Sequence, residues 1–476
     1  MKRFSLLAAI LVLNSCAVGP DYETPAQKHS DSWHSQQALR VAGVAADDIG
    51  WWRQFNDPLL TGLIEKAMVN NRDMAVALAN VERARALRRE AAGGFYPGID
   101  AGASASRSRY SRQNVFGATT GTRNTFSAAL DASWEIDLFG RTRRSVEAAE
   151  ARVGATEAAH RGLTLSLAAE VAAGYFELRG VQSRLAMTRR DIALLGEVEA
   201  IARAQSELGA SSGLDLARAE GERESIEAKL PGLEAEAMAL IYRISVLTGE
   251  APEFHAEALS EAGPMPDVVD RVPVGLRSQI LMRRPDVQLA ERELAAATAN
   301  IGIATADLFP DFSLTGAIGS SARLFSDLFT PATMTRSLGA ALGWPLFAGG
   351  AISARVDVAK AEAKAALARY EQSLLLALED AESSLTRYGN EWLTLKGLRL
   401  AEQSRVRAFE IARLRYEAGE EDFMVMLDAE RALITTREEI VISNVRIHTG
   451  LTQLYKALGG GWKQAGNPET VEVNKE

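Results

Sequence analysis

Residues Arg413–Glu430 read RLRYEAGEEDFMVMLDAE, a segment with one glycine, Gly419, that is preceded and followed by acids. Residues Arg203–Glu220 read RAQSELGASSGLDLARAE, and Gly209 has the same place in them, so the two segments lie 210 residues apart at both ends. Glycine readily takes the left-handed backbone conformation that ends a helix. Each segment therefore predicts the turn of a hairpin between two antiparallel helices.

The prolines leave two long stretches free of helix breakers. None occurs between Pro97 and Pro231, and none between Pro345 and Pro468. Because proline disrupts the interior of a helix, each gap has room for two long helices and the turn that joins them. The expected helices are 140–208, 214–248, 350–416 and 426–458.

The elements before these helices repeat as well. Asp286 lies 213 residues after Asp73, and Phe309-Pro310 follows Tyr96-Pro97 by the same distance. A first helix is expected over 59–92, interrupted near Asn70-Asn71. The chain is therefore predicted to be internally duplicated, and each half contains a helix, two strands and a long helical hairpin.

Apolar residues in the third long helix recur with a coiled-coil spacing. They are separated alternately by four and three residues, which predicts helices packed along their length on their neighbours. The seam consists of Leu374, Leu378, Ala381, Leu385, Tyr388, Trp392 and Leu395.

Two stretches before each long helix alternate between apolar and polar residues. In the clearest one, Phe126, Leu130 and Trp134 alternate with polar residues, which predicts a strand with one apolar and one polar face. The other strands are expected near 99–106, 312–318 and 334–346. The first two strands are long enough to cross a bilayer at a tilt.

The N-terminus is expected to be a targeting segment. Two basic residues precede the short apolar run Phe4–Leu13, and Leu13-Asn14-Ser15-Cys16 resembles a lipobox. Cleavage would remove residues 1–15 and leave Cys16 to carry the lipid, palmitate included. A conventional signal peptide with an incidental cysteine is the alternative.

The composition excludes several functional classes. The formal net charge is −9 and the 476 residues contain no basic block, which argues against a nucleic-acid partner. Cys16 is the only cysteine, so disulfides do not hold the fold together. No nucleophile, zinc or phosphate-binding motif is present, and we expect neither an enzyme nor a cofactor or metal site. The five histidines also lack ligand spacing; they are His29, His34, His160, His255 and His448.

Four strands cannot close a barrel, and an open sheet in lipid would leave backbone groups without hydrogen bonds. The missing strands must then come from other copies of the chain. Two copies would supply eight strands and a lumen filled by side chains, whereas three would supply twelve and room for a pore. The residues alone therefore predict an oligomeric duct.

Several motifs together resemble one known family. They are Cys16-Ala-Val-Gly-Pro-Asp-Tyr22, Trp51-Trp52-Arg-Gln-Phe-Asn-Asp-Pro58, Arg283-Arg284-Pro285-Asp286-Val287, Phe309-Pro310, and Tyr416-x-x-Gly419 with Leu427-Asp428-Ala429. Over nearly all of its mature length the chain resembles the outer-membrane factor family, the TolC-like exit ducts of efflux and type I secretion systems. It is most similar to the OprM/NodT-like lipoprotein branch.

The resemblance implies a mixed α/β membrane protein in the outer membrane, lipid-anchored and extending into the periplasm. It implies a homotrimer with a twelve-stranded β-barrel, continued by a long periplasmic α-helical barrel with an equatorial domain. The implied partners are a periplasmic adaptor, an inner-membrane pump or transporter, and outer-membrane lipid. The expected domain boundaries are 1–15, 16–56, 57–260, 261–458 and 459–476.

The resemblance also implies where the tunnel narrows. In the family an aspartate near the start of the last long helix forms an acidic ring, and the matching residue is Asp428. The antibiotic-efflux branch carries an apolar ring four residues earlier, where this chain has Met424, and Glu420 lies one further turn back. We expect these three to line a periplasmic aperture. The alternatives are that Met424 belongs to the core and that Glu420 is a solvated acid.

Some relatives hold the closed end with a tyrosine before the turn glycine of the second half and an aspartate after that of the first. The matching residues are Tyr416 and Asp215. The arginine that assists in some relatives is replaced here by Glu421, so the lock must differ from that version or be weaker.

Two other functional classes compete with the duct. A lipid-anchored periplasmic coiled-coil scaffold would pair the apolar strand faces in a soluble sandwich without a pore. A stand-alone porin would not need such long helices. Met424 and Met426 would suit a soft ion such as Cu(I), but no histidine or cysteine lies near them. The sequence does not distinguish drugs, metals or secreted products as cargo.

Overall fold

The computed structural model describes residues 17–26, 33–34, 41–42, 50–110, 121–209, 212–268, 272–273 and 277–460. The expected signal peptide 1–15, the lipidation site Cys16 and the tail beyond Gly460 lie outside these residues. The chain forms two compact units. The first contains Met1–Pro25, Asn80–Glu157 and Leu289–Glu371, and the second contains Ala26–Ala79, Ala158–Gln288 and Gln372–Glu476. Each half of the sequence thus contributes to both units.

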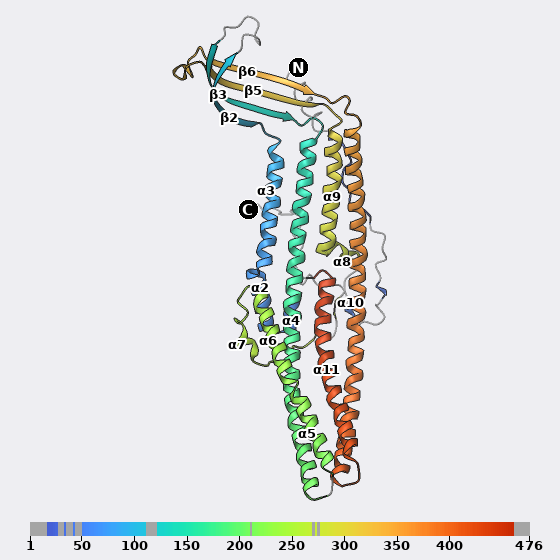
Figure 1. The fold of residues 1–476 in the computed structure, drawn as a ribbon. Helices are drawn as coiled ribbons and strands as arrows, with labels where there is room; N and C mark the ends of the chain where they lie inside the picture. The colour runs from blue at the N-terminus through green and yellow to red at the C-terminus, as the bar shows by residue number, and fades with distance from the viewer. Residues whose placement is uncertain are drawn as a thin grey trace, which may run out of the picture. The chain divides into compact units, whose positions relative to one another are not determined.

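The first unit contains a four-stranded antiparallel sheet in the order β2-β3-β5-β6 (Figure 1). All four expected strands are present. Their bounds are Gly98–Tyr110 for β2, Gly121–Ile136 for β3, Asp311–Ala322 for β5 and Met334–Gly343 for β6. The fourth strand ends at Gly343 and not at Leu346, because Pro345 has no N–H to continue the ladder.

The two faces of this sheet differ as the alternation predicted. Residues that are directly opposite in the ladders lie on the same face. Ala101, Leu130 and Ile318 are aligned on one face, and Asp100, Asp131 and Ala317 on the other. The apolar face is exposed to a large extent, since Ile99 is 70% and Leu338 89% accessible.

Four helices have one part in each unit. They are α3 (Arg72–Gly93), α4 (Arg141–Glu207), α9 (Pro285–Ala306) and α10 (Ala351–Glu417). The helices α4 and α10 each run for 67 residues, which confirms two of the predicted long helices. The carboxylate of Asp137 accepts hydrogen bonds from the amides of Thr142 and Arg143 at 3.1 and 3.0 Å, so β3 ends where this cap of α4 begins.

The remaining elements are short apart from α11. In the first unit η3 covers Phe325–Asp327. The elements of the second unit are β1 (Val41–Ala42), η2 (Trp51–Phe55), α2 (Pro58–Asn70), α5 (Gly213–Glu227), α6 (Leu230–Leu247), α7 (Ala256–Ser260), β4 (Val272–Pro273), α8 (Arg277–Arg283) and α11 (Phe423–Ala457). The parallel pairing of β1 with β4 and the helix α7 are additions to the irregular connectors expected from the sequence.

The predicted interruption near Asn70-Asn71 is confirmed. The side-chain oxygen of Asn71 accepts hydrogen bonds from the amides of Asp73 and Met74, and its amide group donates to the carbonyl of Leu247 at 3.0 Å. One buried side chain therefore caps α3 and joins it to the end of α6.

The prediction of one continuous returning helix over 214–248 is wrong. Helix α5 ends at Glu227 and α6 begins at Leu230. Pro231 explains the break, because it has no N–H to donate to the carbonyl of Glu227 and its ring would clash with that carbonyl.

The core of the second unit contains two of the sequence motifs. Trp51 stacks on Tyr455 with ring centroids 5.3 Å apart, and Phe55 packs on Phe176 at 4.8 Å. Buried Arg284 forms ion pairs with Asp286 at 2.6 Å and Asp380 at 3.0 Å. Both motifs are therefore structural.

The predicted coiled-coil seam of α10 is confirmed. Six of its seven residues are at most 8% exposed, and Trp392 is partly buried against the same core. Among the described residues, no helix combines the length and the apolar character needed to cross a membrane.

Candidate functional site

The turns of the two long hairpins lie next to each other in the second unit (Figure 1). Gly209 and Gly419 take left-handed backbone angles, with φ of 70° and 72°. An added Cβ would meet no atom within 4 Å at either position. Both glycines are therefore required by backbone conformation and not by crowding, as the sequence predicted.

Hydrogen bonds cap the helices at both ends of the second turn. The amide of Gly419 donates to the carbonyl of Tyr416 at 3.0 Å, and that of Glu420 donates to the carbonyl of Arg415 at 2.8 Å. This pair of bonds is a Schellman motif, which ends α10. The carboxylate of Asp422 then accepts a hydrogen bond from the amide of Met424 at 2.9 Å and caps α11.

The positions of these helix ends contradict the prediction that Glu420 lies on the same helical face as Met424. The sequence analysis placed it one helical turn before Met424 on the same face, but α11 begins only at Phe423. Glu420 belongs to the turn, where its exposed carboxylate lies 3.9 Å from Arg415, which also pairs with Glu421 at 3.1 Å. No common helical face therefore joins Glu420 to the other two aperture residues.

A hydrophobic cluster holds the ends of the two hairpins together, and we call it the tip cluster. Two of its aromatic rings, Tyr416 and Phe423, have centroids 5.4 Å apart in an edge-to-face arrangement. The buried members are Val198, Ala202, Ala219, Phe409, Ala412, Tyr416, Phe423, Met426, Leu427 and Leu433. The tip cluster combines residues of α4, α5, α10 and α11, so it fixes both turns relative to each other.

The other predicted aperture residues lie at the edge of the tip cluster. Asp428 is 69% exposed in its side chain, and the nearest guanidinium nitrogen of Arg431 is 4.0 Å away. Met424 is partly buried and packs against the tip cluster. Asp428 can thus face solvent or another copy of the chain, whereas Met424 contributes to the packing of the tip cluster.

The predicted tether is not formed within this chain. The hydroxyl of Tyr416 is buried and has no hydrogen-bond partner among the described residues. Burial raises its pKa, and the nearby carboxylates of Asp215 and Asp422 raise it further. Asp215 instead lies 3.7 Å from Arg218. The structure thus brings Asp215 near the hydroxyl but does not join the two.

The sequence analysis missed Glu430. This carboxylate is fully buried in α11, and neither of its oxygens has a hydrogen-bond partner in the described part of the chain. Burial raises its pKa to about 7, helped by the charges of Glu222 and Asp191 and opposed by Arg431. A signal was available, because Phe423, Leu427, Glu430 and Ile434 are spaced by four, three and four residues, which puts an acid in an apolar seam.

Charge pairs surround the tip cluster. Glu199 accepts from Arg223 at 2.8 Å and from Arg203 at 2.9 Å, and these two hydrogen bonds lower its pKa. Arg431 pairs with Glu222 across the two hairpins. Ion pairs therefore compensate several of the charges around the tip cluster, whereas Glu430 beneath them has no hydrogen-bond partner among the described residues.

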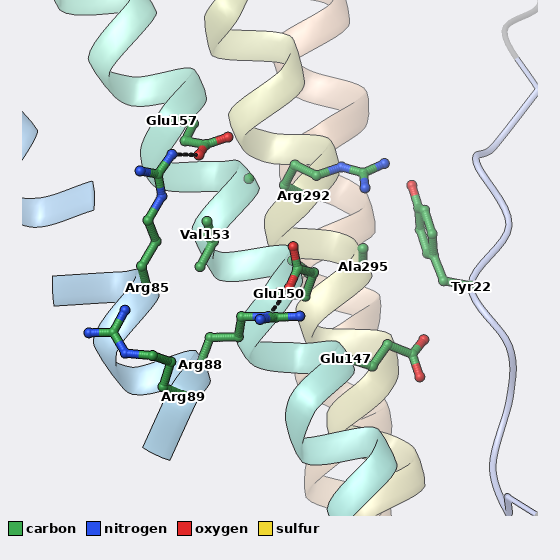
Figure 2. A pocket seen from close by; sticks show the side chains of 12 residues that line it. Tyr22, Arg85, Arg88, Arg89, Glu147, Glu150, Val153, Glu157, Arg292 and Ala295 are labelled. Atoms are coloured by element: carbon green, nitrogen blue, oxygen red, sulfur yellow. Dashed lines mark hydrogen bonds and ion pairs between the residues drawn. The ribbon is translucent and has the colours of Figure 1, made fainter. Parts of the chain in front are cut away.

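The first unit contains a separate pocket of about 820 Å³, lined by α3, α4, α9 and Tyr22 (Figure 2). Arg85 pairs with Glu157 at 2.6 Å, and Arg88 pairs with Glu150. The charges lining the pocket compensate each other in pairs. In the described part of the chain no group of three or more histidine, cysteine or acidic residues could hold a metal ion.

The comparisons with known proteins agree with the duplication. The family described as outer membrane efflux protein matches residues 63–249 and again 276–460. The second match begins 213 residues after the first, which is the offset found between the repeated motifs.

Similar proteins cover the whole chain. The probable efflux pump outer membrane protein TtgC of Pseudomonas putida is 32% identical, over 99% of both chains. The cation efflux system protein CusC of Escherichia coli is 31% identical, over 95% of this chain and 97% of its own. The solved structure of the outer-membrane channel OprN has a TM-score of 0.89 and 36% identity, and the match covers 94% of this chain and 100% of that one.

Proposed function

The chain belongs to the outer membrane efflux protein family, and on that premise we propose that three copies of it form the exit channel of a tripartite efflux system. The protein is an outer-membrane efflux channel subunit that extends into the periplasm. In the proposed assembly a periplasmic adaptor and an inner-membrane pump pass substrates to it, and the energy of transport comes from the pump.

The sheet of the first unit carries this proposal. Among the described strands, β2 and β6 each have a neighbour on one side only. The apolar face is accessible to a large extent, with Leu338 at 89% and Ile99 at 70%. Open edges and an exposed apolar face are unfavourable in water but fit a closed ring of strands in lipid. Three copies would give twelve strands, enough for a pore.

The long helices support the same assembly. Helix α10 buries its seam in its own chain but leaves other large apolar side chains accessible, at 47–65%. These residues are Leu375, Leu376, Leu393, Leu400, Ile411 and Leu414. An apolar helix face of this length fits against the helices of a neighbouring copy.

The aperture is proposed at the hairpin ends. Three copies of Asp428 around a narrow axis would repel one another, so closure must be held by other contacts. The Tyr416 hydroxyl, which has no hydrogen-bond partner among the described residues, is available for a tether to Asp215 when the tip closes. Met424 would contribute an apolar contact beside the Asp428 ring, and Glu420 an acid in the turn.

Single-channel recording tests this placement. Asp428→Asn should lower the preference for cations and weaken block by a multivalent cation from the periplasmic side by about tenfold or more. The matched control is Glu417→Gln, which removes an exposed acid that pairs with Arg413 outside the turn. Unchanged selectivity and block in Asp428→Asn would place the constriction elsewhere.

Assembly can be tested without recording currents. The channel predicts a trimer in outer-membrane extracts that separates into monomers only when it is heated. A lipid-anchored scaffold without a pore predicts instead a protein whose strands are protected in a soluble core. Recovery of monomer from the periplasmic fraction would overturn the proposed channel.

The lipid is proposed to anchor the chain and not to form the pore. Cys16 lies far in sequence from the strands, and one acylated terminus adds membrane affinity only. A Cys16→Ser protein secreted with a cleavable signal should still form trimers. Cargo selection is assigned to the pump, because relatives of nearly equal identity include both a cation efflux system protein and a probable efflux pump outer membrane protein.

A further inference from the structure

The charged residues of the sheet are sorted by face. On the polar face the four strands carry acids, among them Asp100, Asp131 and Glu135, together with Arg123. On the apolar face the charged residues of the described strands are all arginines, namely Arg107, Arg109 and Arg336. We call these three the arginine margin.

The arginine margin lies at one end of the sheet. Arg107 and Arg109 are within three residues of the end of β2, and Arg336 is two residues from the start of β6. Both positions are at the end of the sheet remote from the helices, because β2 follows α3 and β6 precedes α10. The rest of the same face is uncharged, and its polar residues are Thr122, Asn124 and Ser320.

In the described part of the chain, the arginine margin has no acidic partner. In the ladders Arg107 faces Asn124, and Arg109 faces Thr122. Arg336 faces Ile318. All three arginines are exposed, and within the described ranges none forms an ion pair. The three are therefore exposed cations beside an apolar surface, and in the ladders Arg336 is level with Ala101, six and eight positions from Arg107 and Arg109.

Hydrocarbon around a charged side chain is unfavourable, and the penalty falls toward the membrane surface. An arginine at the end of a lipid-facing strand can extend its guanidinium to the headgroups while its stem lies along the apolar surface. Guanidinium groups bind phosphate in a bidentate manner. The arginine margin lies near strand ends, is positively charged, and has no acid on the same face of the described strands. These three properties match an anionic phosphate headgroup.

We propose that the arginine margin binds the phosphate groups of a phosphorylated glycolipid in the outer leaflet. The inference rests on the proposed function, because it needs the apolar face to contact lipid and the end remote from the helices to face outward. Three copies of the margin in a trimer would hold a ring of such lipids around the channel. The site would contribute to the position of the sheet in the membrane and not to the passage of cargo.

Native mass spectrometry of the full-length lipidated trimer in detergent can test the proposal. Diphosphorylated lipid A, or the same lipid with both phosphates removed, is titrated against wild type and the Arg107→Gln/Arg109→Gln/Arg336→Gln variant. Each arginine near an anionic headgroup contributes about fivefold in affinity. We expect the variant to bind the phosphorylated lipid on the order of a hundredfold more weakly. The dephosphorylated lipid should not distinguish the two proteins.

Arg123→Gln is the matched control, because Arg123 lies at the same end of the sheet on the opposite face, across from Ser108. It should bind phosphorylated lipid A like wild type. Inorganic phosphate at the same concentration should not displace the lipid, since the apolar surface contributes to binding. Equal binding by the triple variant, equal loss in Arg123→Gln, or displacement by inorganic phosphate would each overturn the proposal.

Single-channel recording distinguishes failure of the proposed lipid site from failure of the proposed channel function. A triple variant that forms trimers, conducts like wild type and still prefers the phosphorylated lipid would overturn only the lipid site. A wild-type protein that forms no trimer and no conducting channel would overturn the proposed function.

Discussion

The two hairpin turns began as copies of one segment, and they now differ in what supports them. Gly209 and Gly419 share nearly the same φ. The second turn is followed by Asp422, whose side chain caps a helix of 35 residues, whereas Ser212 at the matching position makes no side-chain cap and begins a helix of 15 residues. Backbone geometry was retained in both copies, while support from side chains is concentrated in the second.

The two copies of the turn segment also differ in their charged residues. Glu430 is buried and has no hydrogen-bond partner among the described residues, whereas its counterpart Glu220 is partly exposed and lies 2.8 Å from Arg203. Asp428 corresponds to Arg218, a residue of opposite sign. The first copy therefore serves as a solvated support, and the second contains the groups whose energies change with pH and with assembly.

The largest expected difference in stability between the two hairpins comes from the aromatic rings of the tip cluster. Phe423→Ala should lower the free energy of opening of the second hairpin by about 3–5 kcal/mol, because it empties a fully buried site. Leu214→Ala, at an exposed position of the first hairpin, should change it by less than about 0.5 kcal/mol. Hydrogen exchange of the α11 and α5 amides measures both. Equal effects in the two hairpins would remove the distinction between them.

Glu430 should make the second hairpin sensitive to pH. Its pKa is about 7 in the folded chain and near 4.5 when exposed, so the folded state binds more protons between these values. Stability therefore falls as pH rises from 4.5 to 7, by about 3 kcal/mol per chain. Glu430→Gln should remove this dependence and stabilise the hairpin at pH 8.

Glu220→Gln is the control for that experiment, since Glu220 is partly exposed and the loss of its ion pair with Arg203 should change stability by less than about 1 kcal/mol. Hydrogen exchange at pH 5.5 and pH 8, corrected for intrinsic rates, reports the opening free energy. A pH dependence that persisted in Glu430→Gln would assign the titration to another group, such as Asp191.

The turn glycines should behave alike, which tests whether the copies still share their backbone. Gly209→Ala and Gly419→Ala should each lower local stability by about 1–2 kcal/mol through the left-handed conformation alone, because a Cβ meets no atom at either position. Asparagine in place of alanine should recover part of the loss. A much larger loss at Gly419 would mean that a neighbouring copy packs against that turn.

The smallest effect on stability is expected from the hydroxyl of Tyr416. Tyr416→Phe removes a buried hydroxyl that has no hydrogen-bond partner in the described ranges, so the opening free energy should change by less than about 1 kcal/mol. Single-channel conductance should nevertheless rise if the hydroxyl tethers the closed tip to Asp215. Unchanged conductance would contradict the tether and leave Tyr416 as a packing residue. The matching position in the first copy, Ser206, has no such role.

Long regular elements could be predicted because each leaves a periodic pattern. The seam from Leu374 to Leu395 is regular throughout, and the alternation around Leu130 is interrupted only at Ala129; both were confirmed. The break before Leu230 was missed although Pro231 was visible, because the apolar pattern continues across it. The start of α11 depends on a single hydrogen bond from the amide of Met424 to Asp422, which no periodicity reveals.

The candidate site was predictable in part for a similar reason. Turn glycines and the exposed Asp428 could be found from local sequence and from the resemblance to known ducts. The burial of Glu430 depends on residues of α4 and α5 that are more than 200 positions away. Whether a tyrosine hydroxyl has a partner depends on the arrangement of several helices and, in the proposed trimer, on other copies.

The one-sided pairing of β2 and β6 has a genetic consequence. The two strands run in opposite directions, so β6 of one copy can pair with β2 of the next, and a ring closes head to tail. A copy whose β2 edge accepts no neighbour would still offer β6, enter a growing ring and block its closure. In the proposed trimer, coexpression of such a variant in equal amounts with wild type would leave only about one ring in eight without a variant copy. A loss-of-function mutation in a monomeric enzyme is usually recessive. A mutation of the β2 edge in the proposed ring would instead be dominant.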